Sequence, residues 1–134
     1  MTITLVDSNV LLDIVTADPV WEPWSAGALA IAANEGHLAI NPIVYAEVSA
    51  GFERIEELDA AVPPSVFARM ALPYDAGFLA GKAFVSYRRR GGTKTAPLPD
   101  FYIGAHAAIA KHRLLTRDGR RYRTYFPTVD LLAP

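Results

Sequence analysis

The sequence predicts an α/β fold in which a parallel sheet lies between layers of helices. Two observations predict this fold: segments with strand and helix patterns alternate along the chain, and no linker divides its 134 residues. Parallel strands covered on both faces read as short apolar runs, and such runs occur here. A chain of this length can bury roughly two-thirds of its unfolded surface, so we expect a single domain with one core.

The expected elements follow from local signals. Residues 3–6 form an apolar run typical of a buried strand, and the helical pattern of 9–15 follows with Asp7 or Ser8 as N-cap. Gly36 is expected to end the helix 21–34, and Pro42 fits the first turn of the helix that carries Glu47. The other expected helices are 53–61, 75–90 and 101–111, with a helical turn at 120–123. The other expected strands are 37–40, 66–72, 114–116 and 128–131.

The composition excludes several classes of site. The chain has no cysteine, which rules out disulfides, thiolate zinc ligands and a cysteine nucleophile. Its three histidines, His37, His106 and His112, show no pairing typical of zinc sites, and His106 on an apolar helix is expected to be a core residue. We see no leader pattern and no apolar run of membrane-spanning length, so we expect a cytoplasmic protein without membrane contact.

Charge is divided unevenly along the chain, although the net charge is only −1. Residues 1–81 carry 2 arginines against 11 acids, whereas residues 82–134 carry 11 basic residues against 3 acids. Such asymmetry indicates a polyanionic partner. We interpret part of the basic half as residues that contact phosphates. For any single arginine, a simpler interpretation is a solvent-exposed residue on the outer face of a helix. The arginines of this interpretation are Arg88, Arg89, Arg90 and Arg117.

Four acidic residues lie in surroundings where a lone carboxylate is hard to explain. Asp7 follows the strand 3–6, and Asp118 follows the strand 114–116. Glu47 interrupts an apolar helix, and Asp100 opens a long apolar stretch; both are expected near the starts of helices. In parallel sheets, ligands bind beyond the carboxyl ends of the strands, where these acids would meet. Their mutual repulsion would require a hard divalent cation, so the pattern predicts a metal site.

Most of these residues, and the strand residue Thr116 between Leu115 and Arg117, also have a simpler interpretation. Asp7 and Asp100 could be helix N-caps, and Asp118 before a glycine fits an ordinary turn. Thr116 is more often only a strand residue. Glu47 is the hardest to explain without a site, because its neighbours are apolar.

The four acids belong to short motifs that together resemble a known family. The motifs are Val6-Asp7-Ser8-Asn9-Val10-Leu11-Leu12-Asp13, Ala46-Glu47, Pro99-Asp100-Phe101-Tyr102-Ile103-Gly104-Ala105-His106-Ala107 and Leu114-Leu115-Thr116-Arg117-Asp118. In this order and at these separations they resemble the motifs of PIN-domain ribonucleases, and most of all those of VapC-type toxins from bacterial toxin–antitoxin modules. The resemblance covers essentially the whole chain.

The resemblance implies a PIN-like three-layer sandwich that binds Mg²⁺ or Mn²⁺ and hydrolyses phosphodiester bonds in RNA. It implies Asp7 and Asp100 as direct metal ligands and Asp118 as a direct or water-mediated ligand. Glu47 would be a ligand or would orient the attacking water. Asn9 and Thr116 would support these groups by hydrogen bonds.

The chain departs from the family pattern at two places. Asn9 stands where many members have serine or threonine. Some members carry a further acid beyond Asp118, where this chain has Arg120, Arg121 and Tyr122. The resemblance therefore gives no firm support for a second metal.

Partners are implied by the resemblance as well. VapC-type toxins usually form homodimers and are held inactive by a small antitoxin protein, so we expect both here, with RNA as the substrate. The acidic residues Glu53, Glu56, Glu57 and Asp59 offer a surface for such an antitoxin. A Gly/Pro/Thr loop, 91–99, connects the arginines 88–90 to Asp100. We therefore expect these arginines to lie at the rim of the acidic site and to bind the RNA backbone.

Three other functions are open at this point. A non-catalytic PIN-like scaffold that binds RNA or a protein would keep the fold without the chemistry. A haloacid-dehalogenase-like phosphatase also has an aspartate after its first strand, but its mechanism needs a second one at the position of Asn9. A receiver-like domain would need adjacent acids near the start of the chain, whereas the acids here are dispersed.

Overall fold

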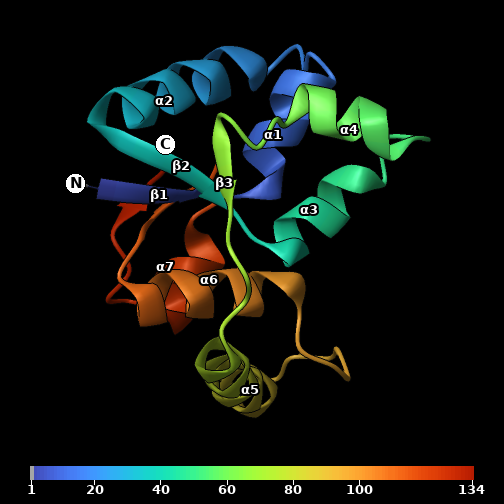
Figure 1. The fold of residues 1–134 in the computed structure, drawn as a ribbon. Helices are drawn as coiled ribbons and strands as arrows, with labels where there is room; N and C mark the ends of the chain where they lie inside the picture. Colours follow the sequence, from blue (N-terminus) through green and yellow to red (C-terminus); the bar gives the residue numbers. More distant parts are fainter. Residues whose placement is uncertain (1) are drawn as a thin grey trace.

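The computed structural model describes residues 2–134, which form a five-stranded parallel sheet between helices (Figure 1). This architecture confirms the predicted α/β fold. The strands are β1 (Thr2–Val6), β2 (Gly36–Ile40), β3 (Phe67–Arg69), β4 (Arg113–Leu115) and β5 (Leu131–Leu132). The helices are α1 (Ser8–Val15), α2 (Glu22–Glu35), α3 (Pro42–Ser49), α4 (Ile55–Ala61), α5 (Tyr74–Arg89), α6 (Pro99–Ala110) and α7 (Arg120–Tyr125).

The strand order is β3-β2-β1-β4-β5, and every neighbouring pair is parallel. From β1 the chain moves outward to β2 and β3, and it then returns to β4 on the other side of β1. The switch point of the sheet therefore lies between β1 and β4, where a ligand site is expected. Helices α1 and α2 cover one face, α6 and α7 cover the other, and α5 packs outside α6 (Figure 1).

The central strands are apolar because both faces of the sheet are covered. Leu5, Val6, Leu114 and Leu115 are fully buried in β1 and β4, so consecutive side chains are buried rather than alternate ones. His106 is also buried, as predicted, and its Nδ1 lies 3.0 Å from Asn41 Nδ2. Within residues 2–134, no helix combines the length and the apolar character that crossing a membrane needs.

Capping residues explain where several helices begin. Asp7 precedes α1 as its N-cap and accepts a hydrogen bond from the Ser8 backbone N–H, as the sequence suggested. Asn41 caps α3 through a hydrogen bond from the Val44 N–H, with Pro42 in the first turn. Asp100 is not a cap: α6 begins at Pro99 after Leu98, so Asp100 lies inside its first turn.

The expected elements differ from the observed ones in a few places. Glu47 lies in the second turn of α3, so the expectation that it would sit near a helix start was wrong. The expected strand 66–72 shortens to β3, and the expected strand 128–131 shifts to β5. Both are edge strands with a single neighbour, so pairing with that neighbour sets their length rather than local β-propensity.

Helix α7 is held in place through its contact with Gly104 of α6. A Cβ atom at Gly104 would lie only 2.4 Å from Phe126 Cδ2 and 3.0 Å from Tyr122 Cδ1. Phe126 and Tyr122 are both buried. The absence of a side chain at Gly104 thus allows α7 and the residue after it to approach α6 closely.

We predict that Gly104→Ala lowers the free energy of unfolding by about 1–3 kcal/mol because the added methyl group overpacks this contact. Gly81→Ala in α5 is the matched control, since a Cβ there meets nothing within 4 Å. The control should gain up to about 1 kcal/mol from the higher helix propensity of alanine. Urea unfolding measures both changes, and a Gly104→Ala protein as stable as the wild type would contradict the proposed contact.

Candidate functional site

The predicted acids lie around the switch point of the sheet. Asp7 follows β1 directly, and Asp118 follows β4 after two further residues. Asp100 belongs to the first turn of α6, and Glu47 projects from α3. The structure brings Asp7, Glu47 and Asp100 close enough to influence one another electrostatically, whereas Asp118 is turned towards an arginine.

Asp7 is a buried carboxylate that is held by donors from three segments. Its exposed fraction is only 3%. Oδ1 accepts a hydrogen bond of 2.7 Å from the Ser8 N–H, and Oδ2 accepts hydrogen bonds from Thr116 Oγ1 at 2.9 Å and from the Tyr122 hydroxyl at 2.8 Å. A buried charge needs such partners, so the surroundings suit an ionised oxygen ligand.

Burial nevertheless makes ionisation of Asp7 costly. Burial and, to a smaller extent, the nearby charge of Asp100 raise the pKa of Asp7 from 3.8 to about 6. The hydrogen bonds from Tyr122, Thr116 and Ser8 lower this pKa but do not cancel the rise. Burial, followed by the charge of Asp7, raises the pKa of Tyr122 well above its ordinary value of 10.0, so Tyr122 remains a hydroxyl donor. A bound cation would offset the repulsion that Asp7 experiences.

Glu47 forms the second part of the same electrostatic group. It is half-buried, and its Oε1 accepts a hydrogen bond of 2.9 Å from Ser8 Oγ. Burial is the main cause that raises the pKa of Glu47, and the charge of Asp100 adds to it. Ser8 therefore links Asp7 and Glu47, because its backbone N–H binds one carboxylate and its hydroxyl binds the other.

Asp100 and Asp118 are each paired with an arginine of α7. Arg121 NH1 lies 3.1 Å from Asp100 Oδ2, and Arg120 Nε lies 3.3 Å from Asp118 Oδ1. The hydrogen bond from Arg120 holds the pKa of Asp118 below its ordinary value. With these pairs in place, no three acids or histidines among residues 2–134 are arranged to enclose an ion.

The residues present still fit a hard divalent cation. Mg²⁺ prefers oxygen ligands, and one or two carboxylates together with waters and a substrate phosphate are sufficient to hold it. Asp7 and Asp100 offer such oxygens, and the repulsion that raises the pKa of Asp7 is what a cation would relieve. To bind the ion, Asp100 and Asp118 would have to release the arginines with which they are paired.

Asn9 and Thr116 connect the start of α1 with the end of β4. Asn9 Nδ2 donates to Thr116 Oγ1 at 3.2 Å, and Asn9 Oδ1 accepts from the Arg117 N–H at 3.1 Å. Thr116 Oγ1 in turn donates to Asp7. Thr116 thus contacts Asp7 directly, whereas Asn9 reaches it only through Thr116, and the backbone N–H of Asp118 also donates to Thr116 Oγ1.

The predicted basic residues are used in different ways. Arg117 binds Asp13 through two hydrogen bonds of 2.8 and 3.1 Å and lies over the Trp21 ring, so an RNA contact by this guanidinium would compete with these bonds. Arg88 donates to the carbonyls of Gly92 and Lys94 and thereby holds the loop that leads to α6.

The remaining two predicted arginines reach solvent. Arg89 is exposed at the end of α5, and Arg90 lies 5.5 Å from the centroid of the Tyr125 ring. Tyr125 lines a cavity of about 370 Å³ beside the acids. The residues that line this cavity, which we call the arginine cavity, are Tyr87, Asp100, Asp118, Arg120, Arg121, Thr124 and Tyr125.

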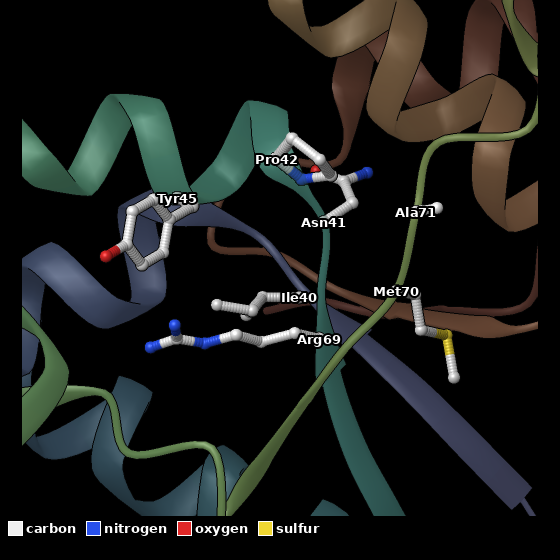
Figure 2. A pocket seen from close by; sticks show the side chains of 7 residues that line it. All are labelled: Ile40, Asn41, Pro42, Tyr45, Arg69, Met70 and Ala71. Atoms are coloured by element: carbon white, nitrogen blue, oxygen red, sulfur yellow. The ribbon is translucent and has the colours of Figure 1, made fainter.

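A second cavity of about 370 Å³ lies at the ends of β2 and β3 (Figure 2). Figure 2 shows the guanidinium of Arg69 beneath the ring of Tyr45, and both side chains bind Asp59. None of the residues that line this cavity is acidic, so it offers no carboxylate to a metal ion. The lining residues are Ile40, Asn41, Pro42, Tyr45, Arg69, Met70 and Ala71.

Sequence reasoning missed Ser8 and Tyr122 as members of the site, and it considered Arg120 and Arg121 only as part of the basic half and as residues that stand in place of a further acid. Ser8 follows Asp7 directly, and a hydroxyl next to an acid of interest was the available signal. Tyr122 gave little signal, because its role depends on how α7 packs against α6.

The family model of the PIN domain matches residues 4–127 of the chain. Among solved structures, the fold is similar to VapBC2 from Rickettsia felis bound to a DNA fragment from its promoter, with 18% identity, a TM-score of 0.75 and 99% of each chain covered. It is also similar to VapBC-1 from nontypeable Haemophilus influenzae, with 16% identity, a TM-score of 0.74 and 98% of each chain covered. No curated protein sequence matches the chain.

A toxin–antitoxin complex from Klebsiella pneumoniae is similar as well, with 22% identity, a TM-score of 0.66 and 94% of each chain covered. At these identities the similarity shows a shared fold. The match to the family model is independent of it and covers most of the chain.

The raised pKa of Asp7 predicts a pH-dependent loss of stability. Well below pH 3.8 the carboxyl is protonated in both states. As the pH rises from there through 6, the unfolded state ionises first, so the native state loses up to about 3 kcal/mol. In Asp7→Asn this loss should be smaller. Thermal unfolding in EDTA at about pH 4 and about pH 8 measures the difference. An identical pH dependence in both proteins would show that Asp7 ionises without cost.

Proposed function

Because the chain belongs to the PIN-domain family, we propose that it is a metal-dependent endoribonuclease and the toxin of a toxin–antitoxin pair. One observation carries the proposal: a buried carboxylate, Asp7, is held by three donors beside Glu47 and Asp100 at the switch point of the sheet. Acids gathered in this way suit a cation that activates water against a phosphodiester.

Mg²⁺ or Mn²⁺ would supply the chemistry by lowering the pKa of a bound water and by offsetting charge on the leaving oxygen. In our proposal Asp7 and Asp100 hold the ion, and Asp118 contributes directly or through a water. Ser8, Thr116 and Tyr122 keep the Asp7 oxygens fixed through their hydrogen bonds. No side-chain nucleophile is needed.

Glu47 is suited to the proton transfer. Its pKa is raised chiefly by burial, so its carboxylate is a stronger base than an exposed glutamate. Ser8 Oγ fixes one of its oxygens and leaves the other available to a ligand or to a water. We therefore propose that Glu47 either binds the ion or orients the attacking water.

The basic end of α5 supports RNA as the substrate. Arg89 and Arg90 are exposed at the end of α5, where the loop that leads to Asp100 begins, so in our proposal they contact the phosphate backbone without reading its sequence. Arg88 would act mainly through the loop that it holds.

The alternative is a PIN-like scaffold that binds RNA or a protein without cutting it. The buried carboxylate of Asp7 favours catalysis over this alternative, because its charge destabilises the native state unless a cation is present. A scaffold would be more stable with an uncharged residue at that position.

We propose an antitoxin and a second copy of the chain as partners. The structural neighbours include VapBC and other toxin–antitoxin complexes. The predicted acidic surface would act mainly through Glu53 and Glu57, since Asp59 is already bound by Arg69 and Tyr45 and Glu56 lies 3.5 Å from Arg54. For the homodimer, α5 offers Tyr74 and Phe78, whose exposed fractions are 99% and 70%.

We predict that the purified protein cleaves labelled cellular RNA in Mg²⁺ or Mn²⁺ and not in EDTA. Asp100→Asn should lower the cleavage rate by roughly a hundredfold or more, because the ion loses a ligand. Asp75→Asn is the matched control, since Asp75 is an exposed acid at the start of α5 and should be dispensable.

If folded, antitoxin-free protein bound RNA but cut none of it in either metal, the scaffold would be the better function. Equal cleavage by wild type and Asp100→Asn would contradict the assignment of Asp100.

A further inference from the structure

Two arginines of α7 occupy the carboxylates that the proposed metal needs. Arg121 lies on Asp100 at 3.1 Å, and Arg120 lies on Asp118 at 3.3 Å. Both arginines follow Asp118 closely in sequence, so the segment after β4 carries an acid of the site together with two positive charges. These pairs neutralise the two outer acids, Asp100 and Asp118. The two inner acids, Asp7 and Glu47, have no arginine partner among residues 2–134.

The two ion pairs are exposed enough to be exchanged. The side chains of Arg121 and Asp100 are 41% and 33% exposed, and those of Arg120 and Asp118 are 88% and 51% exposed. Exposed ion pairs contribute little to stability, since water screens the attraction and the long side chains lose entropy. Each arginine can therefore leave its carboxylate at a small cost.

The same arginines line a space that can receive an RNA strand. The arginine cavity has a volume of about 370 Å³ and contains Tyr87, Thr124 and Tyr125 as well as the two ion pairs. A guanidinium binds phosphate through paired hydrogen bonds as readily as it binds carboxylate. A phosphodiester that enters the cavity would lie beside both arginines and next to the acids of the proposed cleavage site.

We propose that Arg120 and Arg121 are exchangeable counter-ions. In the free protein they pair with Asp118 and Asp100. When a metal ion binds these carboxylates, the two arginines bind the phosphates of an RNA strand in the arginine cavity. This inference rests on the proposed ribonuclease function and names how its site receives the substrate. It also gives a role to the pairing of Asp100 and Asp118 with α7 in the free chain.

The first test measures Mn²⁺ binding in the absence of RNA. Electron paramagnetic resonance gives the concentration of the free ion. Each of Arg121→Ala and Arg120→Ala should raise Mn²⁺ affinity by about two- to five-fold, because a competing positive charge is removed. Arg123→Ala is the matched control: Arg123 lies on the same helix, is exposed and forms no ion pair among residues 2–134. It should leave Mn²⁺ affinity unchanged.

The second test is binding of a fluorescein-labelled oligouridylate in EDTA across a range of KCl concentrations. Arg120→Ala/Arg121→Ala should bind the oligonucleotide more weakly than the wild type. Its slope of log affinity against log salt should fall by about 0.7 for each lost phosphate contact. Arg123→Ala should keep the wild-type slope.

The expected result is thus a pair of opposite changes: the double variant binds Mn²⁺ more tightly and RNA more weakly. Unchanged or weaker Mn²⁺ binding would overturn the counter-ion role. An unchanged salt slope would overturn the phosphate role. Both readouts are independent of cleavage, so a protein that shows the opposite changes but cuts no RNA would support this inference while the ribonuclease proposal failed.

Discussion

Keeping a charged carboxylate in the interior is the constraint on which the arrangement of this site depends. An ionised oxygen can stay buried only where donors reach it. For Asp7 these donors come from the start of α1, the end of β4 and α7, as Ser8, Thr116 and Tyr122. Because each donor belongs to a different segment, satisfying one carboxylate fixes how three segments lie relative to one another.

The packing of α7 extends this constraint to the substrate side. Gly104 allows Tyr122 to reach the interior, and the same short helix carries Arg120 and Arg121 on its exposed side. One face of α7 therefore stabilises the innermost acid, while the other neutralises the outer acids Asp100 and Asp118. A shift of this helix would change the inner hydrogen bond and the outer ion pairs together.

The fold and the positions of Asp7 and Asp118 were predictable because they follow from local patterns. The apolar run before Asp7 and the strand before Asp118 placed both acids at the same edge of a parallel sheet, and the structure has them there. The role of Tyr122 was not predictable, since its hydroxyl reaches Asp7 across 115 positions of sequence. The pairing of Arg121 with Asp100 likewise depends on how α7 packs, which no local pattern encodes.

The most direct test of this account is a crystal structure of the protein soaked in Mn²⁺, with the ion located by its anomalous scattering. The account predicts an ion in contact with carboxylate oxygens of Asp7 and Asp100, with Arg121 turned away from Asp100. An ion bound only elsewhere, with Asp7 still enclosed by its three donors and Arg121 still on Asp100, would contradict a metal site at this edge of the sheet.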